Sequence, residues 1–143
     1  MTPLVAAGVT GALLLLALGL GVLLRRRGAS VREATAGERV DPADLGEQGF
    51  GPAGAVVQFS TEYCARCPAV RRTLAELVTA REPLRYLHVD VTDRPELAAK
   101  YRLRQTPTVL LLGPDGALST RMSGQLTRQT LTDAIDRFLG GST

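Results

Sequence analysis

The two cysteines of this chain lie three positions apart, at Cys64 and Cys67, and the sequence contains no others. A strand-like apolar run, 55–59, ends just before them, and a helical pattern begins directly after them. At the first turn of a helix, unpaired backbone N–H groups and the positive end of the helix dipole stabilise an anion, so a thiol there ionises more easily. We therefore assign Cys64 as the nucleophile and Cys67 as the resolving thiol of a disulfide exchange, with Arg66 favouring the thiolate.

Three other interpretations of the cysteine pair stay open. A structural disulfide normally closes a longer loop, because its entropic contribution grows with loop length. A zinc site needs about four ligands, and His88 is the one histidine of the chain, so no metal is expected. The third alternative is a chance pairing of buried cysteines. On the leading interpretation the redox group is the Cys64–Cys67 disulfide itself, and no further cofactor is expected.

The N-terminal segment predicts a membrane anchor. Residues 4–24 contain no charged side chain, and at ~1.5 Å per residue a helix of this length reaches about 32 Å, enough to cross a ~30 Å hydrocarbon core. A cleaved signal peptide, the alternative, places its basic residues before the apolar run, whereas here Arg25, Arg26 and Arg27 follow it. This order favours an uncleaved, single-pass anchor that holds residues 4–24 in the lipid bilayer.

The distribution of charge predicts the orientation of this anchor. Lys and Arg in short flanks prefer the cytoplasmic side of a membrane. Arg32 adds to the basic C-terminal flank, and no Lys or Arg precedes the apolar run. We therefore expect the rest of the chain on the cytoplasmic face. The net charge of +3 is small and owes much to this flank, and no basic patch interleaved with aromatic residues is present, so nucleic acid is not an expected partner.

The chain divides into a transmembrane anchor with its basic flank at 1–27, a linker at 28–38 and one domain at 39–143. Hydrophobic periodicity and turn residues place the elements of the domain. The expected strands are a short one around Arg39 and Val40, then 55–60, 84–91, 107–112 and 117–122, and the expected helices are 65–80, 94–101 and 125–139, with Asp93 and Thr127 as N-caps of the last two. This order predicts an α/β fold with a mixed central β-sheet flanked by helices.

From residue 39 to about 141 the chain resembles the thioredoxin family. The resemblance rests on the dithiol between a buried strand and a helix, on Thr106-Pro107 at the entry to the next buried strand, and on Gly124 after the final hairpin. It implies a thioredoxin-like fold in which Pro107 is cis and faces the dithiol, so that the Thr106 backbone can pair with a substrate chain. Tyr63 and Gly124 are expected to contact the same substrate. A trans proline at the start of an edge strand is the alternative.

The departures from the family pattern concern proton transfer. Tyr63 stands where the family carries Trp, and Gln58 stands where it carries a buried acid thought to help deprotonate the resolving thiol. Gln58 cannot act as a base, so we expect the second step to be slow or to use water. Tyr86 falls near the position of the lysine that pairs with this acid. Glu62 is interpreted as a solvated loop acid, and His88 as a packed or edge histidine.

The leading functional hypothesis is a membrane-tethered thiol–disulfide oxidoreductase. It would reduce or exchange disulfides in client proteins, including membrane proteins, and a reductase or another electron donor would restore its dithiol. The first alternative is a thioredoxin-like binding module with little redox turnover, because Gln58 replaces the acid. The second places the domain outside the cytoplasm, as a thiol protein of envelope disulfide or cytochrome-maturation chemistry.

Overall fold

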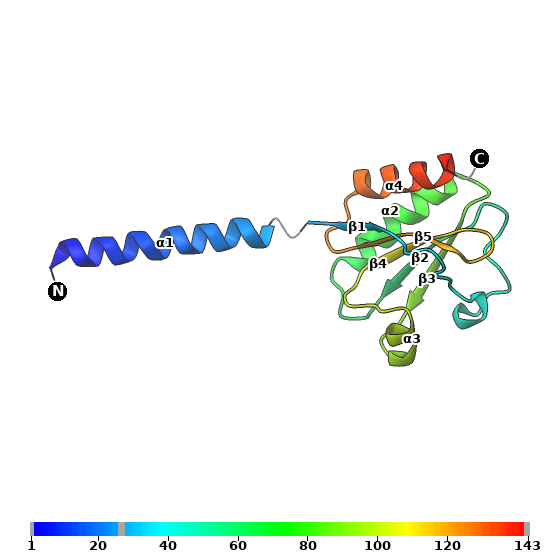
Figure 1. Cartoon of the computed structure of the whole chain (residues 1–143), viewed down its shortest axis with the longest axis horizontal. Helices are drawn as coiled ribbons and strands as arrows, with labels where there is room; N and C mark the ends of the chain where they lie inside the picture. Colours follow the sequence, from blue (N-terminus) through cyan, green and yellow to red (C-terminus); the bar gives the residue numbers. More distant parts are fainter. Residues whose placement is uncertain (1, 26–27, 142–143) are drawn as a thin grey trace.

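The computed structural model describes residues 2–25 and 28–141, so Arg26 and Arg27 of the predicted basic flank lie outside the described residues. A long helix, α1 (Pro3–Arg25), leads into an α/β domain (Figure 1). The elements of the domain are, in chain order, β1 (Ser30–Glu33), the 3-10 helix η1 (Pro42–Leu45), β2 (Ala55–Ser60), α2 (Cys67–Thr79), β3 (Arg85–Asp90), α3 (Pro95–Lys100), β4 (Thr108–Leu112), β5 (Leu118–Ser123) and α4 (Arg128–Gly140).

Helix α1 is long and apolar enough to cross a bilayer. Its candidate span, Pro3–Leu24, has a mean hydropathy of 2.3, and none of it is buried against the rest of the protein. Among residues 2–25 and 28–141 it is the one helix that meets this test. A signal sequence near an N-terminus has the same length and composition. The structure therefore contains the apolar helix that the sequence predicted.

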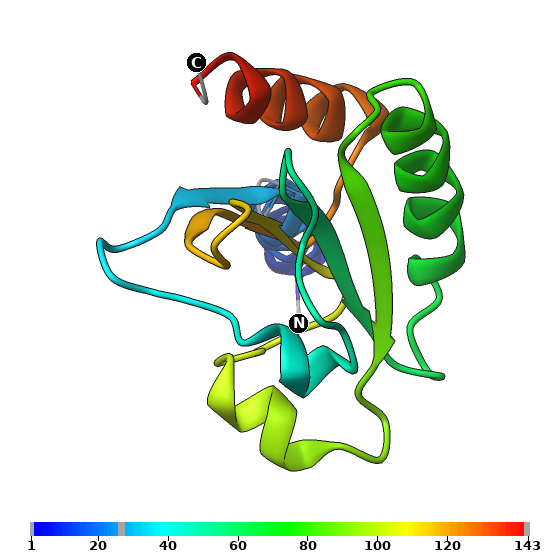
Figure 2. The same ribbon diagram turned by 90° about the vertical axis from the view of Figure 1, so that its right-hand side faces the viewer.

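The domain is built on one mixed sheet, as predicted. The strand order is β1-β5-β4-β2-β3, in which β2 and β3 are parallel and the other neighbours antiparallel. Helices α2 and α4 cover one face, and α3 and η1 lie on the other (Figure 2). Alternate residues of β2 point to opposite faces: Val56 packs in the core under α2 and α4, and Val57 in the core toward α3. This thioredoxin-like arrangement confirms the predicted fold.

Strand β1 lies inside the segment that was predicted to be a linker. Its four residues pair antiparallel with β5, from Ser30 opposite Ser123 to Glu33 opposite Thr120. Three of the four are exposed and the fourth is half-buried, so the sequence carries no apolar alternation that could reveal a strand. The strand predicted around Arg39 is instead an isolated bridge to Ala117. The sheet therefore begins earlier in the chain than the pattern indicated.

The ends of the helices also differ from the predictions. Thr127 is the N-cap of α4, and its side chain accepts a hydrogen bond from Thr130 N, as expected. The N-cap predicted at Asp93 is wrong, because Arg94 occupies that position and makes no capping bond through its side chain. Proline favours the first helical position. Since Pro95 opens α3, the cap falls on the residue directly before it.

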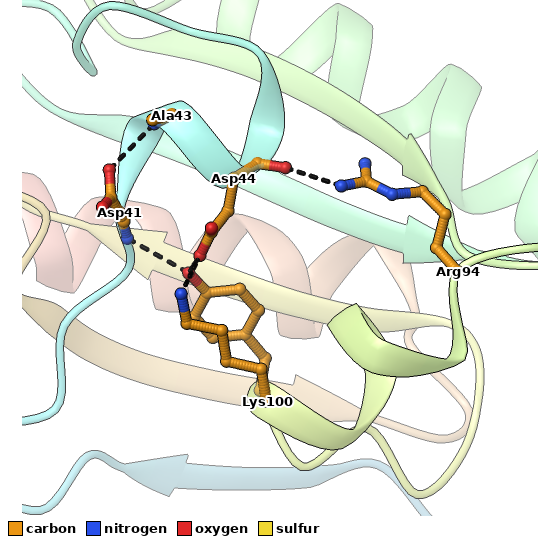
Figure 3. Close-up of polar contacts among 6 residues, drawn as sticks. Asp41, Ala43, Asp44, Arg94 and Lys100 are labelled. Atoms are coloured by element: carbon orange, nitrogen blue, oxygen red, sulfur yellow. Dashed lines mark hydrogen bonds and ion pairs between the residues drawn. The ribbon is translucent and has the colours of Figure 1, made fainter.

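A polar cluster joins η1 to α3 on the face away from α2 (Figure 3). The Asp44 carboxylate accepts hydrogen bonds from Lys100 Nζ, at 2.5 Å, and from the Tyr101 hydroxyl. The Arg94 guanidinium donates to the Asp44 carbonyl oxygen at 2.9 Å, and Asp41 N donates to the Tyr101 hydroxyl at 3.1 Å. The bonds from Lys100 and Tyr101 hold the pKa of Asp44 below its usual value. This cluster therefore fixes the segment before β2 by charge as well as by packing.

Candidate active site

Cys64 and Cys67 form a disulfide at the start of α2, with Sγ atoms 2.13 Å apart and Cα atoms 5.5 Å apart. Two successive turns lead from the end of β2 into the helix, closed by Cys64 N to Thr61 O at 3.2 Å and Cys67 N to Cys64 O at 3.3 Å. Cys67 is only 4% exposed, whereas Cys64 is half-buried. An incoming disulfide can therefore reach the sulfur of Cys64 more easily than that of Cys67.

The start of α2 places positive charge beside the two sulfurs. Arg66 is the N-cap residue, its backbone is already helical, and its side chain makes no capping hydrogen bond. Pro68 follows within the first turn and has no N–H of its own. The positive end of the helix dipole and the exposed Arg66 side chain thus lie beside Cys64 and Cys67. This electrostatic environment favours a thiolate over a neutral thiol.

The Thr106–Pro107 loop lies next to the disulfide loop. Antiparallel pairing of β2 with β4 sets Phe59 opposite Thr108, so the last residues of β2 lie beside the first residues of β4. Thr61 Oγ1 and Thr106 Oγ1 are 3.3 Å apart, which joins the two loops directly. The Thr106–Pro107 bond is cis, as the family resemblance implied, and Pro107 is buried.

The other predicted contact residues, Gly124 and Tyr63, border this region from different sides. Gly124 follows β5 with φ of +91°, and a Cβ built on it would lie 4.0 Å from Gln105 Nε2 and 3.3 Å from the Gly28 carbonyl oxygen. The Gln105 amide in turn donates to Ser123 Oγ at 3.0 Å. Gly124 therefore adjoins the loop that carries Thr106. Tyr63 is 84% exposed, so its ring lies in solvent beside Cys64. The roles of these residues stay predictions.

Gln58 lies fully buried beneath the disulfide and is hydrogen-bonded at both ends of its amide. Its Nε2 donates to the Cys67 carbonyl oxygen at 3.0 Å, and its Oε1 accepts from the Tyr86 hydroxyl at 2.7 Å. A carbonyl oxygen can only accept, so the amide nitrogen must face Cys67. Burial raises the pKa of Tyr86 to about 12, against the smaller opposing effect of Arg71. The two positions at which the family carries charges therefore form a neutral pair here.

A cleft of about 370 Å³ opens beside this pair, and both cysteines line it. His88 lines it too, half-buried, with its Nε2 2.5 Å from Ser60 Oγ. Burial, and then the charge of Arg71, lower the pKa of His88, while Asp90 opposes them. Sequence reasoning placed His88 in a strand but did not bring it to the cysteines. The signal was available in the alternating polar positions of the two neighbouring strands, 58 and 60 on one, 86 and 88 on the other.

Within residues 2–25 and 28–141, no group of three or more His, Cys, Asp or Glu side chains is arranged to hold a metal ion. The groups of this site that can do chemistry include the disulfide and the side chains that surround it. Those side chains supply a buried hydrogen-bonding pair, an imidazole with a hydroxyl partner, and arginines at the rim of the cleft.

Comparison with known proteins shows which family this chain resembles. Residues 52–137 match the family model described as Thioredoxin. Among curated proteins, the chain is similar to the chloroplastic thioredoxin M-type of Zea mays, with 28% identity over 88 residues that cover 61% of this chain and 52% of the relative. It is also similar to thioredoxin of Staphylococcus aureus, with 28% identity over 85 residues that cover 59% and 81% of the two chains. The chain thus spans about half the length of the Zea mays relative.

Solved structures of thioredoxins are similar to this chain in fold. Oxidized mitochondrial thioredoxin 3 from Saccharomyces cerevisiae superposes with a TM-score of 0.51 at 25% identity, covering 58% of this chain and 76% of the other. Thioredoxin 2 from Pseudomonas aeruginosa PAO1 in its reduced form gives a TM-score of 0.56 at 22% identity, covering 77% and 97%. At that identity the second likeness shows the fold alone.

Proposed function

The chain belongs to the thioredoxin family, and on this premise we propose that it is a thiol–disulfide oxidoreductase that reduces disulfides of client proteins through Cys64 and Cys67. One observation carries the proposal. A disulfide between a half-buried Cys64 and a buried Cys67 stands at the start of a helix, beside the loop of the cis Pro107. A purely structural cross-link would need neither the difference in exposure nor the adjoining loop.

The reaction starts from the reduced chain and proceeds in two exchanges. The Cys64 thiolate attacks one sulfur of the client disulfide, forms a mixed disulfide and expels the other client sulfur as a thiolate. Cys67, on the first turn of α2, then attacks Cys64 Sγ and releases the second client thiolate. The positive end of the α2 dipole and Arg66 stabilise the Cys64 thiolate, and the Thr106 backbone aligns the client chain. An electron donor, such as a reductase, restores the dithiol.

Reduction of insulin disulfides by the full-length chain in detergent tests this activity. We expect the wild-type chain to reduce insulin in the presence of a chemical reductant, and Cys64→Ser to be inactive because it lacks the nucleophile. With the reductant removed, pre-reduced Cys67→Ser should accumulate a mixed disulfide with the client, and pre-reduced Cys64→Ser should not. Equal rates for the wild-type chain and Cys64→Ser would refute the proposal.

A binding module with little turnover is the second candidate, and one observation favours it. The buried Gln58–Tyr86 pair offers no carboxylate to take the Cys67 proton. Such a protein would form the mixed disulfide from Cys64 at a normal rate and release its client very slowly. Single-turnover measurement of the two steps separates a binding module from an oxidoreductase, because an oxidoreductase must complete both.

We further propose that α1 anchors the chain in a membrane, with the domain on the cytoplasmic face and membrane proteins among its clients. The apolar span Pro3–Leu24 and the arginines that follow it support this arrangement. A membrane-impermeant maleimide applied to intact cells should leave reduced Cys64 unlabelled until the membrane is opened. Labelling from outside would reverse the orientation and point to envelope disulfide chemistry. Loss of residues 1–27 from the mature chain would show that α1 is a signal sequence instead.

A further inference from the structure

A row of polar side chains runs across β2 and β3 under the start of α2. Parallel pairing sets Gln58 opposite His88, so Gln58 and Ser60 of β2 face the same side as Tyr86 and His88 of β3. The row is made of two hydrogen-bonded pairs, Gln58 with Tyr86 and Ser60 with His88. The first pair supports the Cys67 carbonyl oxygen, and the second lies in the cleft that both cysteines line.

The first pair cannot take a proton from a thiol. The Gln58 amide is not basic at any ordinary pH, and both of its ends are already bonded. The Tyr86 phenol has its pKa raised to about 12 by burial, so it is fully protonated near neutrality. Resolution of a mixed disulfide nevertheless requires Cys67 to lose its proton, because only the thiolate is a nucleophile. The acceptor is therefore a group other than Gln58 or Tyr86.

His88 is suited to that role by position and by charge state. It is half-buried in the cleft, and Arg71 and Arg72 of α2 line the same space, with Asp90 on its own strand and Glu62 on the preceding loop. Burial and Arg71 keep the pKa of His88 below its ordinary value, against the effect of Asp90. The imidazole is therefore neutral near pH 7, which leaves one ring nitrogen free to accept a proton.

We propose that His88, held by Ser60, accepts the proton of the Cys67 thiol during the resolving step. The inference rests on the proposed oxidoreductase function and adds the group that makes its second step possible. Cys67 and His88 line one cleft, and the proton passes through this cleft from the thiol to the ring. A base on the neighbouring strand thus takes the place of the buried acid that the family carries where Gln58 stands here.

The proton and electron balance of the step is complete. The Cys67 thiol gives its proton to His88, and the thiolate attacks Cys64 Sγ in the mixed disulfide. The Cys64–Cys67 bond forms as the bond to the client sulfur breaks, and the electron pair leaves on the client thiolate. The imidazolium then returns its proton to that thiolate. Cys64 and Cys67 are oxidised, the client is reduced, and no other reactant is needed.

Ser60 explains how His88 can change charge without rearrangement. A hydroxyl is both a donor and an acceptor. With His88 Nε2 protonated, Ser60 Oγ, 2.5 Å away, accepts its hydrogen bond in both the neutral and the charged ring, and Nδ1 is the nitrogen left to take the proton. Ser60 is itself buried, at 3% exposed, so its position is well defined. It therefore acts as a positioning residue, and His88 as the group that carries the proton.

Stopped-flow reaction of the reduced full-length chain with a fluorescent peptide disulfide, across pH 5–9, tests the proposal. The first phase reports the mixed disulfide on Cys64, and the second reports its resolution by Cys67. We expect His88→Gln to slow the second phase by about 10²-fold at pH 7 and to shift its pH dependence toward the ~8.5 of a free thiol. The first phase should change by less than about threefold. Added imidazole should restore a fast second phase to His88→Ala, which shows that the variant is folded.

Glu62→Gln is the matched control, because Glu62 is another titratable group of the same cleft. It should leave both phases as in the wild-type chain. A second phase in His88→Gln with the wild-type rate and pH profile would overturn the proposal, and so would a loss seen in Glu62→Gln instead. If the wild-type chain shows no first phase at all, the oxidoreductase function has failed, which is a different result from a failed assignment of His88.

Discussion

Replacing Tyr86 by Phe removes one hydroxyl and leaves the ring in place. That hydroxyl is the donor to Gln58 Oε1, at 2.7 Å, and Gln58 is completely buried. The other end of the amide is held by the Cys67 carbonyl oxygen, so the side chain cannot turn to find a new partner without breaking that bond. The substitution therefore leaves a buried acceptor without a hydrogen bond.

The expected cost follows from this burial. A buried polar group that loses its partner destabilises a fold by about 1–3 kcal/mol. Taking ~2 kcal/mol, and about 4–8 °C per kcal/mol for a domain of this size, the midpoint of thermal unfolding should fall by roughly 8–16 °C. Phe fills the same space as Tyr, so no cavity contributes to this estimate. Gln58→Leu in the Tyr86→Phe background removes the acceptor that has lost its partner. The double variant should therefore lose less stability than the sum of the losses in Gln58→Leu alone and Tyr86→Phe alone.

Thermal unfolding of the oxidised full-length chain, followed by far-UV circular dichroism in a fixed detergent, measures this effect. Tyr63→Phe is the control, because it makes the same chemical change on a ring that is 84% exposed. It should shift the midpoint by no more than a surface substitution does, within about 0.5 kcal/mol. A Tyr86→Phe midpoint indistinguishable from that of Tyr63→Phe would refute the argument that the buried pair stabilises the fold.

Three further predictions concern the fold and the dithiol. Gly54→Ala should lower the free energy of unfolding by more than about 1 kcal/mol, because φ is +88° and the new Cβ would collide with the Leu112 carbonyl oxygen. Urea titration measures this, with Gly49→Ala as the control because nothing lies near a Cβ there. Equal midpoints for the two variants would contradict the prediction. Asp44→Asn should lower the unfolding midpoint at pH 7, and this difference should shrink as the pH falls below about 3.8. The reason is that a carboxyl with a lowered pKa stabilises the fold above its unfolded value near 3.8 and loses this effect as pH falls through its folded pKa. A difference that stays constant as the pH falls would exclude this explanation. Iodoacetamide should modify Cys64 of the reduced chain before Cys67, which is only 4% exposed, and equal rates in peptide mass spectra would count against the assignment of the nucleophile.

Much of the fold could be predicted because its central strands are strongly patterned. All residues of β2 and β4 are buried, and continuous apolar runs of that kind have few interpretations once helices alternate with them. Strand β1 was missed for the opposite reason. It is short and mostly exposed, and it exists because β5 pairs with it. Its stabilisation comes from a partner far away in the sequence, and a local pattern cannot report such a partner.

In the site, too, features that follow from a short stretch of sequence could be predicted, and features that depend on how the strands pair could not. The disulfide loop and the cis proline could be predicted because both follow from short motifs in the family resemblance. The bond from Tyr86 to Gln58 and the contact of His88 with Ser60 depend on the exact parallel register of β2 and β3. A shift of one residue would turn every side chain of a strand to the other face. These polar residues could therefore be identified from the sequence, but their hydrogen-bond partners could not.

Because the sheet begins as early as Ser30, the domain can extend only a short way from α1. Residues 26–29 are all that separate the end of α1 from Ser30 of β1, and at ~3.3–3.6 Å per residue they extend to about 14 Å at most. Gly28, within that stretch, already adjoins Gly124 beside the substrate loop. If α1 stays in the bilayer, so short a connection keeps the dithiol close to the lipid surface. Which disulfides meet it would then depend on their height above the membrane, and a soluble client would have to approach the surface to be reduced.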